Sequence, residues 1–423
     1  RIKELIVAEG LGGYYFDDLT AIKNGAEKDG YFILGEPMTP GHKKVRNPGQ
    51  TISIMLKLDT GDIALGSCVA IQYSGVVGRD PILLPEVYIP FIQEHVKPLL
   101  EGREITTFRE LAEWFDNIKI DGKKMHTGIR YGVTQALLEA VAIKEKITEA
   151  EVIAKEYGTE ISNKLIPVVA QSSDQRYLNA DKMIIKRVPA IPQGLFNSVE
   201  KVGEKGEKLE EYVRWLVKRV KDYGDPDYFP IIYLDVYGIP GKIFNHDPIV
   251  MAKYLAWLEE IAKPYKLGIE CPADTGDRDG TMNVMIELVH ELDKLGSNVC
   301  ITADDWCNTL EDIKYFVDNK AAHMIQIKTP DLGGINNSIE AALYCQSKGI
   351  KVFLGGTCNG TEISSRATVN AAMATKADLI YNKPGMGVDE GYMIVYNEMQ
   401  RILAILNAKG YWDKTKKETL SYA

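Results

Sequence analysis

Three short apolar runs in the second half of the chain each end in an acid: Ile231–Asp235 (IIYLD), Lys266–Glu270 (KLGIE) and Val299–Asp304 (VCITAD). A fourth run, Met324–Lys328 (MIQIK), ends in a lysine. Each run has the length of a β-strand, and the first three acids lie about 35 residues apart, which leaves room for one strand, one loop and one helix. In a closed parallel barrel, successive strands deliver their last residues to one rim. The runs therefore predict a barrel that gathers these charged side chains at one end.

Strand-like and helix-like segments alternate along the chain from about residue 165 onward. Several strand-like runs are almost continuously hydrophobic, as expected when both faces of a sheet are covered. Eight such units predict a TIM-like (β/α)8-type barrel. An open doubly wound sheet is the alternative, but no glycine-rich phosphate loop follows the first strand. The expected strands are residues 165–171, 182–188, 231–238, 265–272, 298–305, 324–330, 351–357 and 379–385.

The first part of the chain has a different pattern. Residues 50–75 read as two strands joined by a turn at Asp59–Asp62. Strands followed by helices indicate a separate α+β unit. We therefore expect an N-terminal α+β capping domain over residues 1–160 and a barrel domain over residues 161–423, with a C-terminal helix near its end. The expected helical stretches of the cap are residues 83–102, 106–120 and 126–146.

Composition and charge exclude several classes of function. The chain has 423 residues, long enough for two domains, and a formal net charge of −9, which argues against nucleic acid as the main partner. It has neither a membrane-length apolar stretch nor the apolar core of a signal peptide at its start. The six cysteines form no CxxC pair and are expected to be buried free thiols. We therefore expect a cytoplasmic protein that binds neither nucleic acid nor membranes.

Asp235, Glu270 and Asp304 are candidate metal ligands. A single acid at a strand end often caps the next helix or meets a basic residue, but three at successive strand ends form an oxygen-rich group. Without a cation the three charges would repel one another and raise their pKa values. A hard ion such as Mg²⁺ relieves that repulsion. If the strand continues through it, the adjacent Asp305 is expected to point away from the rim, because successive side chains of a strand alternate.

Lys328 is the candidate base. A lysine is usually solvated, but this one closes an apolar strand one position beyond the three acids. Partial desolvation and a nearby metal ion are expected to lower its pKa, so that it could remove a proton next to a carboxylate. Neutral polar side chains at other strand ends could bind that carboxylate, although each could instead satisfy local backbone. They are Gln171, Gln193, Gln326, Thr357 and Cys358.

Several long motifs resemble those of the methylaspartate ammonia-lyase family, within the enolase superfamily, nearly from end to end. The most specific are IQIKTPDLGG at 325–334 and KPGMGVDEG at 383–391. The resemblance implies an α+β cap on a (β/α)7β-type barrel, usually paired as a homodimer. It also implies Mg²⁺ at Asp235, Glu270 and Asp304, and a base at Lys328. Substrate contacts are implied for Gln72, Gln171, Gln326, Thr357 and Cys358.

The activity that this resemblance implies is the reversible elimination of ammonia from L-threo-3-methylaspartate to give mesaconate, a step of glutamate degradation. Lys328 would remove the C3 proton, and Mg²⁺ would stabilise the enediolate, as in other enolase-superfamily sites. One alternative is another carboxylate dehydratase, racemase or cycloisomerase of the superfamily. A non-catalytic binding protein on a barrel fold is another, and the four matched strand ends argue against it.

Gln193 departs from the family pattern, which places a histidine after the second strand. Glutamine cannot act as an acid or a base, so a scheme with lysine on one face and histidine on the other is not expected here. Gln193 can still donate a hydrogen bond to a carboxylate. Tyr381 is also bulkier than the aliphatic residue that the family pattern suggests, which would make the pocket smaller.

Overall fold

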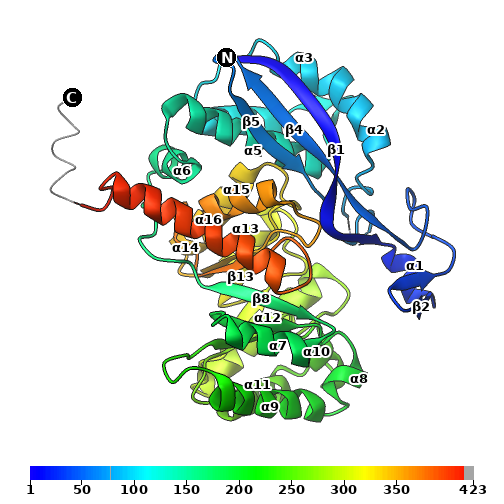
Figure 1. Cartoon of the computed structure of the whole chain (residues 1–423). Helices are drawn as coiled ribbons and strands as arrows, with labels where there is room; N and C mark the ends of the chain where they lie inside the picture. The colour runs from blue at the N-terminus through cyan, green and yellow to red at the C-terminus, as the bar shows by residue number, and fades with distance from the viewer. Residues whose placement is uncertain (77, 414–423) are drawn as a thin grey trace.

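The computed structural model describes residues 1–76 and 78–413, and it consists of a barrel with an N-terminal cap stacked on it (Figure 1). The strands of the barrel are β8 (Val168–Ser173), β9 (Ala190–Gly194), β10 (Ile231–Asp235), β11 (Leu267–Glu270), β12 (Cys300–Ala303), β13 (Met324–Ile327), β14 (Lys351–Leu354) and β15 (Leu379–Tyr381). They are parallel and follow chain order, and β15 pairs with β8 to close the circle. The predicted (β/α)8-type barrel is therefore confirmed.

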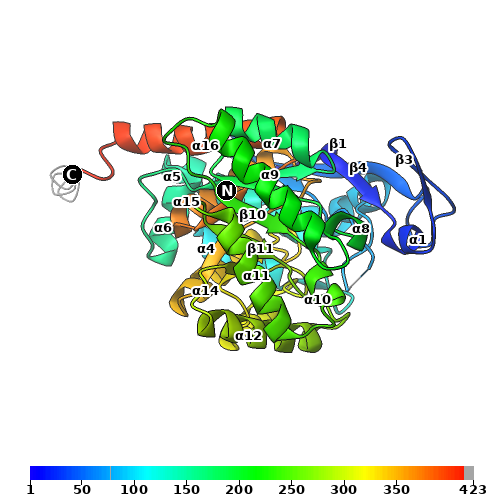
Figure 2. The ribbon, with the colours of Figure 1, turned by 90° about the horizontal axis from the view of Figure 1, so that it is seen from below.

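Helices connect these strands and surround the barrel (Figure 2). They are α7 (Arg176–Ile185), α8 (Val199–Val202), α9 (Glu207–Tyr223), α10 (Ile239–Ile243), α11 (Pro248–Ala262), α12 (Arg278–Lys294), α13 (Leu310–Asp318), α14 (Ile335–Ser347), α15 (Glu362–Thr375) and α16 (Asp389–Ala408). The last of these, α16, packs against α15 and β8. Within residues 1–76 and 78–413, no helix is long and apolar enough to cross a membrane.

The second barrel strand does not lie where the sequence predicts it. The run at 182–188 was expected to form this strand, but α7 covers it as far as Ile185, and β9 follows instead. Residues buried at helical spacing in α7 are Asn179, Ala180, Met183 and Ile184. Ile185 is 81% exposed, although a strand at this place would have both faces covered. The sequence of β9 does not read as a strand because it contains Pro192 and Gly194, and both residue types are disfavoured inside strands.

The cap is an antiparallel sheet flanked by helices. Its central strand β4 (Arg46–Leu58) pairs with β1 (Ile2–Asp17) and with β5 (Ile63–Cys68), which confirms the predicted turn at Asp59–Asp62. The long strand β1 has no counterpart in the sequence prediction, because glycines interrupt its alternation. The other elements are α1 (Leu19–Lys23), β2 (Glu27–Asp29), β3 (Phe32–Leu34), α2 (Pro85–Phe91), the π-helix η1 (Ile92–Val96), α3 (Lys97–Leu100), α4 (Phe108–Asp116), β6 (Lys119–Ile120), β7 (Lys123–Lys124), α5 (Thr127–Glu145) and α6 (Glu149–Tyr157).

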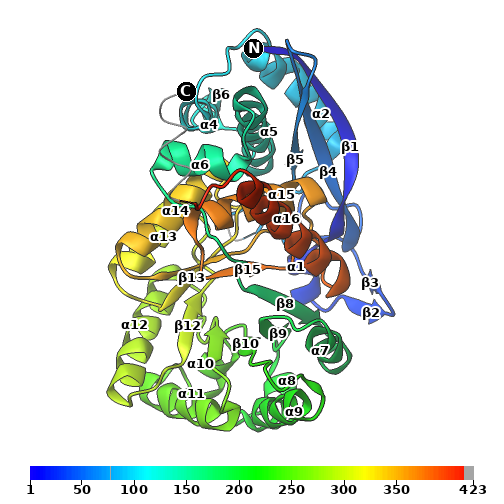
Figure 3. The ribbon, with the colours of Figure 1, turned by 60° about the vertical axis from the view of Figure 1, so that its left-hand side comes forward.

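Close backbone approach joins the cap to the carboxyl ends of the barrel strands (Figure 3). A side chain at Gly12 would collide with the backbone of Asn359, so glycine is needed where β1 passes the loop after β14. The neighbouring Gly13 N–H donates to the carbonyl of Gly360 at 2.9 Å. In α5, the hydroxyl of Tyr131 lies 2.9 Å from that of Thr329, just beyond β13. The cap therefore covers the rim that carries the predicted site.

Candidate active site

Asp235, Glu270 and Asp304 lie on adjoining strand ends. Asp235 is paired with Glu270 in the ladder between β10 and β11. Glu270 is in turn paired with Thr302 of β12, two residues before Asp304. All three side chains are buried, with at most 6% of each residue exposed. The parallel register thus places the three acids next to one another on one rim of the barrel.

The electrostatics of this rim favour a bound cation. Burial raises the pKa values of Asp235 and Glu270 well above the ordinary carboxyl range, and neighbouring carboxylates raise them further. Burial also raises the pKa of Asp304 to about 6, against the opposing effect of Lys328. In the described part of the chain, Asp304 Oδ1 is buried without a hydrogen-bond partner. An all-oxygen group of this charge suits Mg²⁺, so the residues present fit such an ion.

Two amide side chains already bind these carboxylates. Gln193 Nε2 donates to Asp235 Oδ2 at 3.0 Å, and Gln326 Nε2 donates to Glu270 Oε1 at 2.9 Å. Gln193 lies inside β9, and not beyond the end of the second strand as the sequence suggested. The hydroxyl of Tyr381 donates to Gln193 Oε1, which leaves the amide N–H groups to face the carboxylates. The bulky Tyr381 therefore fixes the orientation of the Gln193 amide.

Lys328 follows β13 directly, and its amine is paired with acids. Nζ lies 2.8 Å from Asp304 Oδ2 and 3.4 Å from Asp305 Oδ1. Burial lowers the pKa of Lys328, but the two carboxylates outweigh burial and set that pKa well above its usual value. The lowered pKa expected from the sequence is therefore not found. The expected orientation of Asp305 is also wrong, because β12 ends at Ala303 and the chain turns before Asp305.

The carboxylates are neighbours, but their oxygens are not drawn together around one point. In residues 1–76 and 78–413, the group of three or more possible metal-ligating side chains whose ligand atoms all lie within 4.8 Å of one another consists of Cys271, Asp304 and Asp305. Burial raises the pKa of the Cys271 thiol well above its usual value, and Mg²⁺ prefers oxygen over sulfur. Asp304 belongs both to this group and to the three predicted metal ligands. Bringing Asp235 and Glu270 to the same ion requires rotation of side chains that the amides and Lys328 now hold.

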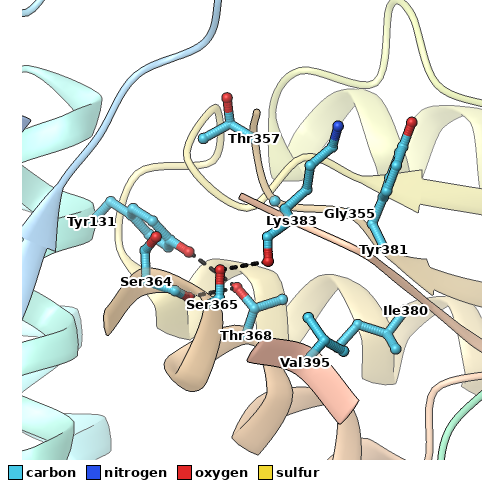
Figure 4. A pocket seen from close by; sticks show the side chains of 11 residues that line it. Tyr131, Gly355, Thr357, Ser364, Ser365, Thr368, Ile380, Tyr381, Lys383 and Val395 are labelled. Carbon is cyan, nitrogen blue, oxygen red and sulfur yellow. Dashed lines mark hydrogen bonds between the residues drawn. The ribbon is translucent and has the colours of Figure 1, made fainter. Parts of the chain in front are cut away.

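A second set of predicted residues lies beside the acids, where the cap meets β8 and the loop after β14. Gln171 and Thr357 are 4% and 5% exposed. The sulfur of Cys358 lies 4.0 Å from Gln72 Oε1, and Gln72 Nε2 donates to Asp17 at 2.7 Å. Polar atoms from the cap and the barrel thus come together here, next to a small cavity of about 10 Å³ whose lining includes Thr357 (Figure 4).

Comparison with known proteins settles the family. Models of the methylaspartate ammonia-lyase N-terminus and C-terminus match residues 1–158 and 160–408. The chain belongs to the methylaspartate ammonia-lyase family. Methylaspartate ammonia-lyase 1 of Carboxydothermus hydrogenoformans is 51% identical over 96% of this chain and 97% of its own length. Because members of the family are ammonia-lyases, this chain is a carbon–nitrogen lyase.

Solved structures of methylaspartate ammonia-lyases share the whole fold. The Mg complex of β-methylaspartase from Clostridium tetanomorphum has a TM-score of 0.95 at 49% identity, covering 97% of this chain and all of that one. The Citrobacter amalonaticus enzyme containing (2S,3S)-3-methylaspartic acid has the same TM-score at 47% identity, over 96% and 100% of the two chains. Muconate lactonizing enzyme from Pseudomonas fluorescens, with a TM-score of 0.58 over 88% and 84% at 16% identity, shares the fold alone.

Sequence reasoning gave no role to two charged residues at the site of this methylaspartate ammonia-lyase family member. Arg79, from the cap, lies 3.0 Å from Asp331 Oδ2 and donates to Asn308 at 3.0 Å, which ties the cap to the loop after Lys328. The sequence could have pointed to Arg79, because it is a charged residue within the glycine-rich run GVVGRD. Lys383 is buried just beyond β15. It opens the family motif KPGMGVDEG, but its position in Asn-Lys-Pro resembles a surface turn, so the residue pattern gave it no chemical role.

Proposed function

We propose that this enzyme eliminates ammonia from L-threo-3-methylaspartate to give mesaconate, and catalyses the reverse addition, with Mg²⁺ as its cofactor. The observation that carries the proposal is the Lys328 amine, held 2.8 Å from Asp304 within a buried rim of carboxylates. The relatives support the ligands, because one complex contains Mg and another contains (2S,3S)-3-methylaspartic acid. The buried, charged rim also argues against a merely structural barrel.

Asp235, Glu270 and Asp304 would hold the ion. When bound, Mg²⁺ would supply a Lewis acid for negative charge that develops on the side-chain carboxylate of the substrate. Lys328 has a raised pKa while it is paired with Asp304 and Asp305, so it becomes an effective base only when that pairing is weakened. Asp304 therefore serves two purposes: it would be a ligand of the ion, and it holds the base in position.

Proton removal begins at C3 of the substrate. Lys328 Nζ takes the proton, and the electron pair of the broken C–H bond moves toward the adjacent carboxylate. Gln326 has one N–H bound to Glu270, so its second N–H can donate to that charge. Gln193 Nε2 donates to Asp235 at 3.0 Å and lies 3.4 Å from both carboxylate oxygens of Glu270, so it bridges these two acids. The electrons then form the C2–C3 double bond as ammonia leaves C2.

The carboxylate beside the amino carbon of the substrate would lie against Gln171, Thr357 and Cys358. Gln72 has its amide N–H bound to Asp17, and its Oε1, which faces the Cys358 sulfur at 4.0 Å, has a second lone pair that can accept a hydrogen bond. The donor that the substrate offers at neutral pH is its ammonium group. Gln72 would therefore hold the leaving nitrogen from the cap, while the barrel holds the two carboxylates.

We expect ammonia release from L-threo-3-methylaspartate to require a divalent ion. Treatment with EDTA should reduce the rate at least about 100-fold, and added Mg²⁺ should restore it, because the carboxylates cannot otherwise stabilise an anionic substrate. The measurement is ammonia released with time, with absorbance of mesaconate as a second readout. A superfamily dehydratase would release no ammonia, and a binding protein would turn over nothing. Full activity in the presence of EDTA would contradict the metal assignment.

We also expect the single base to make the enzyme selective for one isomer. With Lys328 on one face of C3 and an amide from Gln193 near the acids, addition of ammonia to mesaconate should give almost solely the threo product. Gln193→His would introduce a group whose unperturbed pKa is about 6.5, and should raise turnover of the erythro isomer. The measurement is the threo-to-erythro ratio by proton NMR at long reaction times.

Tyr381→Phe provides the matched control for this experiment. It removes the hydroxyl that orients Gln193 and adds no titratable group, so it should not raise turnover of the erythro isomer. Comparable rates on both isomers in the unmodified enzyme would contradict the single-base interpretation. They would indicate another residue, or a water molecule, on the far face of C3.

A further inference from the structure

Lys383 is a buried cation that the proposed mechanism does not use. It lies two residues beyond the end of β15, with 7% of the residue exposed. Its amine donates to Gln171 Oε1 at 2.7 Å and to the carbonyl of Gly385 at 3.2 Å. The sulfur of Met386 is 3.7 Å away, and the amine lies 4.2 Å from the centre of the Tyr381 ring. These contacts fix the position of the amine firmly.

The described neighbours of Lys383 do not include a counter-ion. Among the described residues, no carboxylate oxygen lies within 4.0 Å of its amine, whereas Lys328 has two such partners. Burial lowers the pKa of Lys383 to about 8, so most molecules have a charged amine at neutral pH. A buried charge is usually paired with an opposite charge, because its desolvation is otherwise uncompensated. The missing anion is therefore expected to come from outside the chain.

The direction of the side chain indicates where this anion would bind. In Figure 4, Lys383 runs alongside Tyr381, and its nitrogen points to the same side as the Thr357 hydroxyl. The nitrogen points away from Ser365 and Thr368, which lie at the other end of the view. Gln171 lies at this same place, bound to the amine through its Oε1. The amine therefore faces the polar group formed by Gln171, Thr357 and Cys358.

We propose that Lys383 is the positive charge that selects a second carboxylate on the substrate, acting together with Gln171 and Thr357. This inference rests on the proposed function, in which the substrate is a dicarboxylate and its side-chain carboxylate lies at the acids. The carboxylate beside the amino carbon then lies at the Lys383 end. Because the amine occupies Gln171 Oε1, the amide N–H groups of Gln171 turn toward the ligand. Lys383 thus supplies charge directly and orients a neutral donor.

If Lys383 had a purely structural role, its replacement would impair turnover of charged and neutral substrates alike. The preference of the enzyme for a charged substrate therefore distinguishes a structural role from a role in carboxylate binding. The proposed experiment compares 3-methylaspartate with the analogue in which the carboxylate beside the amino carbon is a primary amide. In the unmodified enzyme, kcat/KM should favour the diacid by about 100-fold, the range for a buried charge pair. Lys383→Met should reduce kcat/KM for the diacid by a similar factor, mainly through KM. It should change kcat/KM for the amide by less than about threefold.

Two further variants complete the test. Lys383→Gln keeps a hydrogen-bond donor without the charge, and should lose the preference for the diacid as Lys383→Met does. Lys43→Met removes a surface charge paired with Glu86 and should leave both rates unchanged. An equal loss on both substrates, or a preference that survives in the Lys383 variants, would overturn the proposal and leave Lys383 a structural residue.

Binding to the unmodified enzyme tests the inference without turnover or folding of a variant. Calorimetric titration with mesaconate should give an affinity at least about tenfold higher than titration with the mesaconate monoamide that lacks the carboxylate away from the methyl group. Equal affinities would overturn the role of Lys383. If the diacid is preferred but no ammonia is ever released from methylaspartate, the proposed reaction fails while the carboxylate subsite stands.

Discussion

Lys328→Ala should reduce kcat for L-threo-3-methylaspartate by about 10⁴-fold while the protein stays folded with Mg²⁺ present. General-base catalysis by a positioned side chain contributes about 10²–10⁴-fold, and the weakly acidic C3 proton places this enzyme at the upper end. The telling measurement is exchange of the C3 hydrogen with deuterated solvent, followed by NMR. Exchange should become undetectable along with ammonia release. If the variant exchanges that hydrogen at the unmodified rate, Lys328 is not the base.

One further variant separates the role of a base from the role of a positive charge at Lys328, and a second variant is its control. Lys328→Arg keeps a cation beside Asp304 but should be as inactive as the alanine variant, because a guanidinium group stays protonated. Lys314→Ala, in α13, removes a partly exposed lysine whose amine lies 5.4 Å from the centre of the Tyr344 ring, and it should retain full activity. An active arginine variant would show that the amine acts through its charge, which would leave proton transfer to another group.

The amino-acid sequence predicts the barrel and the acids at its rim for a simple physical reason. Parallel strands with both faces covered are continuously apolar, so a charged residue marks the place where burial by neighbouring helices stops. Asp235, Glu270 and Lys328 each occupy such a place. The register of the sheet then needs no further information to bring Asp235 beside Glu270.

The environment of a side chain cannot be predicted from the local sequence where distant parts of the chain form that environment. Lys383 lies in a run that reads as a turn, yet it is buried by the residues around Gln171, which is 212 residues away in sequence. Asp305 faces Lys328 because β12 ends two residues before it, and the position of a strand end is set by packing as much as by local preference. The pKa of Lys328 likewise depends on acids that only the fold brings near.

Asp235→Asn should abolish the stabilisation that Mg²⁺ gives to the enzyme, and with it nearly all activity. An ion at about 100 times its Kd stabilises the folded state by about 2.7 kcal/mol, which thermal unfolding detects as a rise in Tm. The unmodified enzyme should show this rise, and the variant should show little or none. Activity should fall at least about 100-fold, because the remaining acids leave the ion without one of its three charges.

Without Mg²⁺, the same substitution should act in the opposite direction. Asp235 is buried beside other carboxylates, and burial with their repulsion raises its pKa well above the usual range. A charged carboxylate whose folded pKa is raised destabilises the folded state at neutral pH, and a neutral amide removes that contribution. The metal-free variant should therefore have a higher Tm than the metal-free unmodified enzyme, by an amount equivalent to about 1 kcal/mol or more.

A loss of the Mg²⁺-dependent rise in Tm, combined with a higher Tm in the absence of Mg²⁺, distinguishes a metal ligand from an ordinary buried acid. Glu204→Gln removes one negative charge from the exposed surface of the barrel, and should change neither the metal-free Tm nor the rise with Mg²⁺. Glu270→Gln and Asp304→Asn should behave as Asp235→Asn does, except that Asp304→Asn also deprives Lys328 of its nearest partner. A variant of Asp235 that keeps the full Mg²⁺-dependent rise in Tm would remove this residue from the cation site. The site would then have to be built around Asp304 and Asp305, whose oxygens already lie close together.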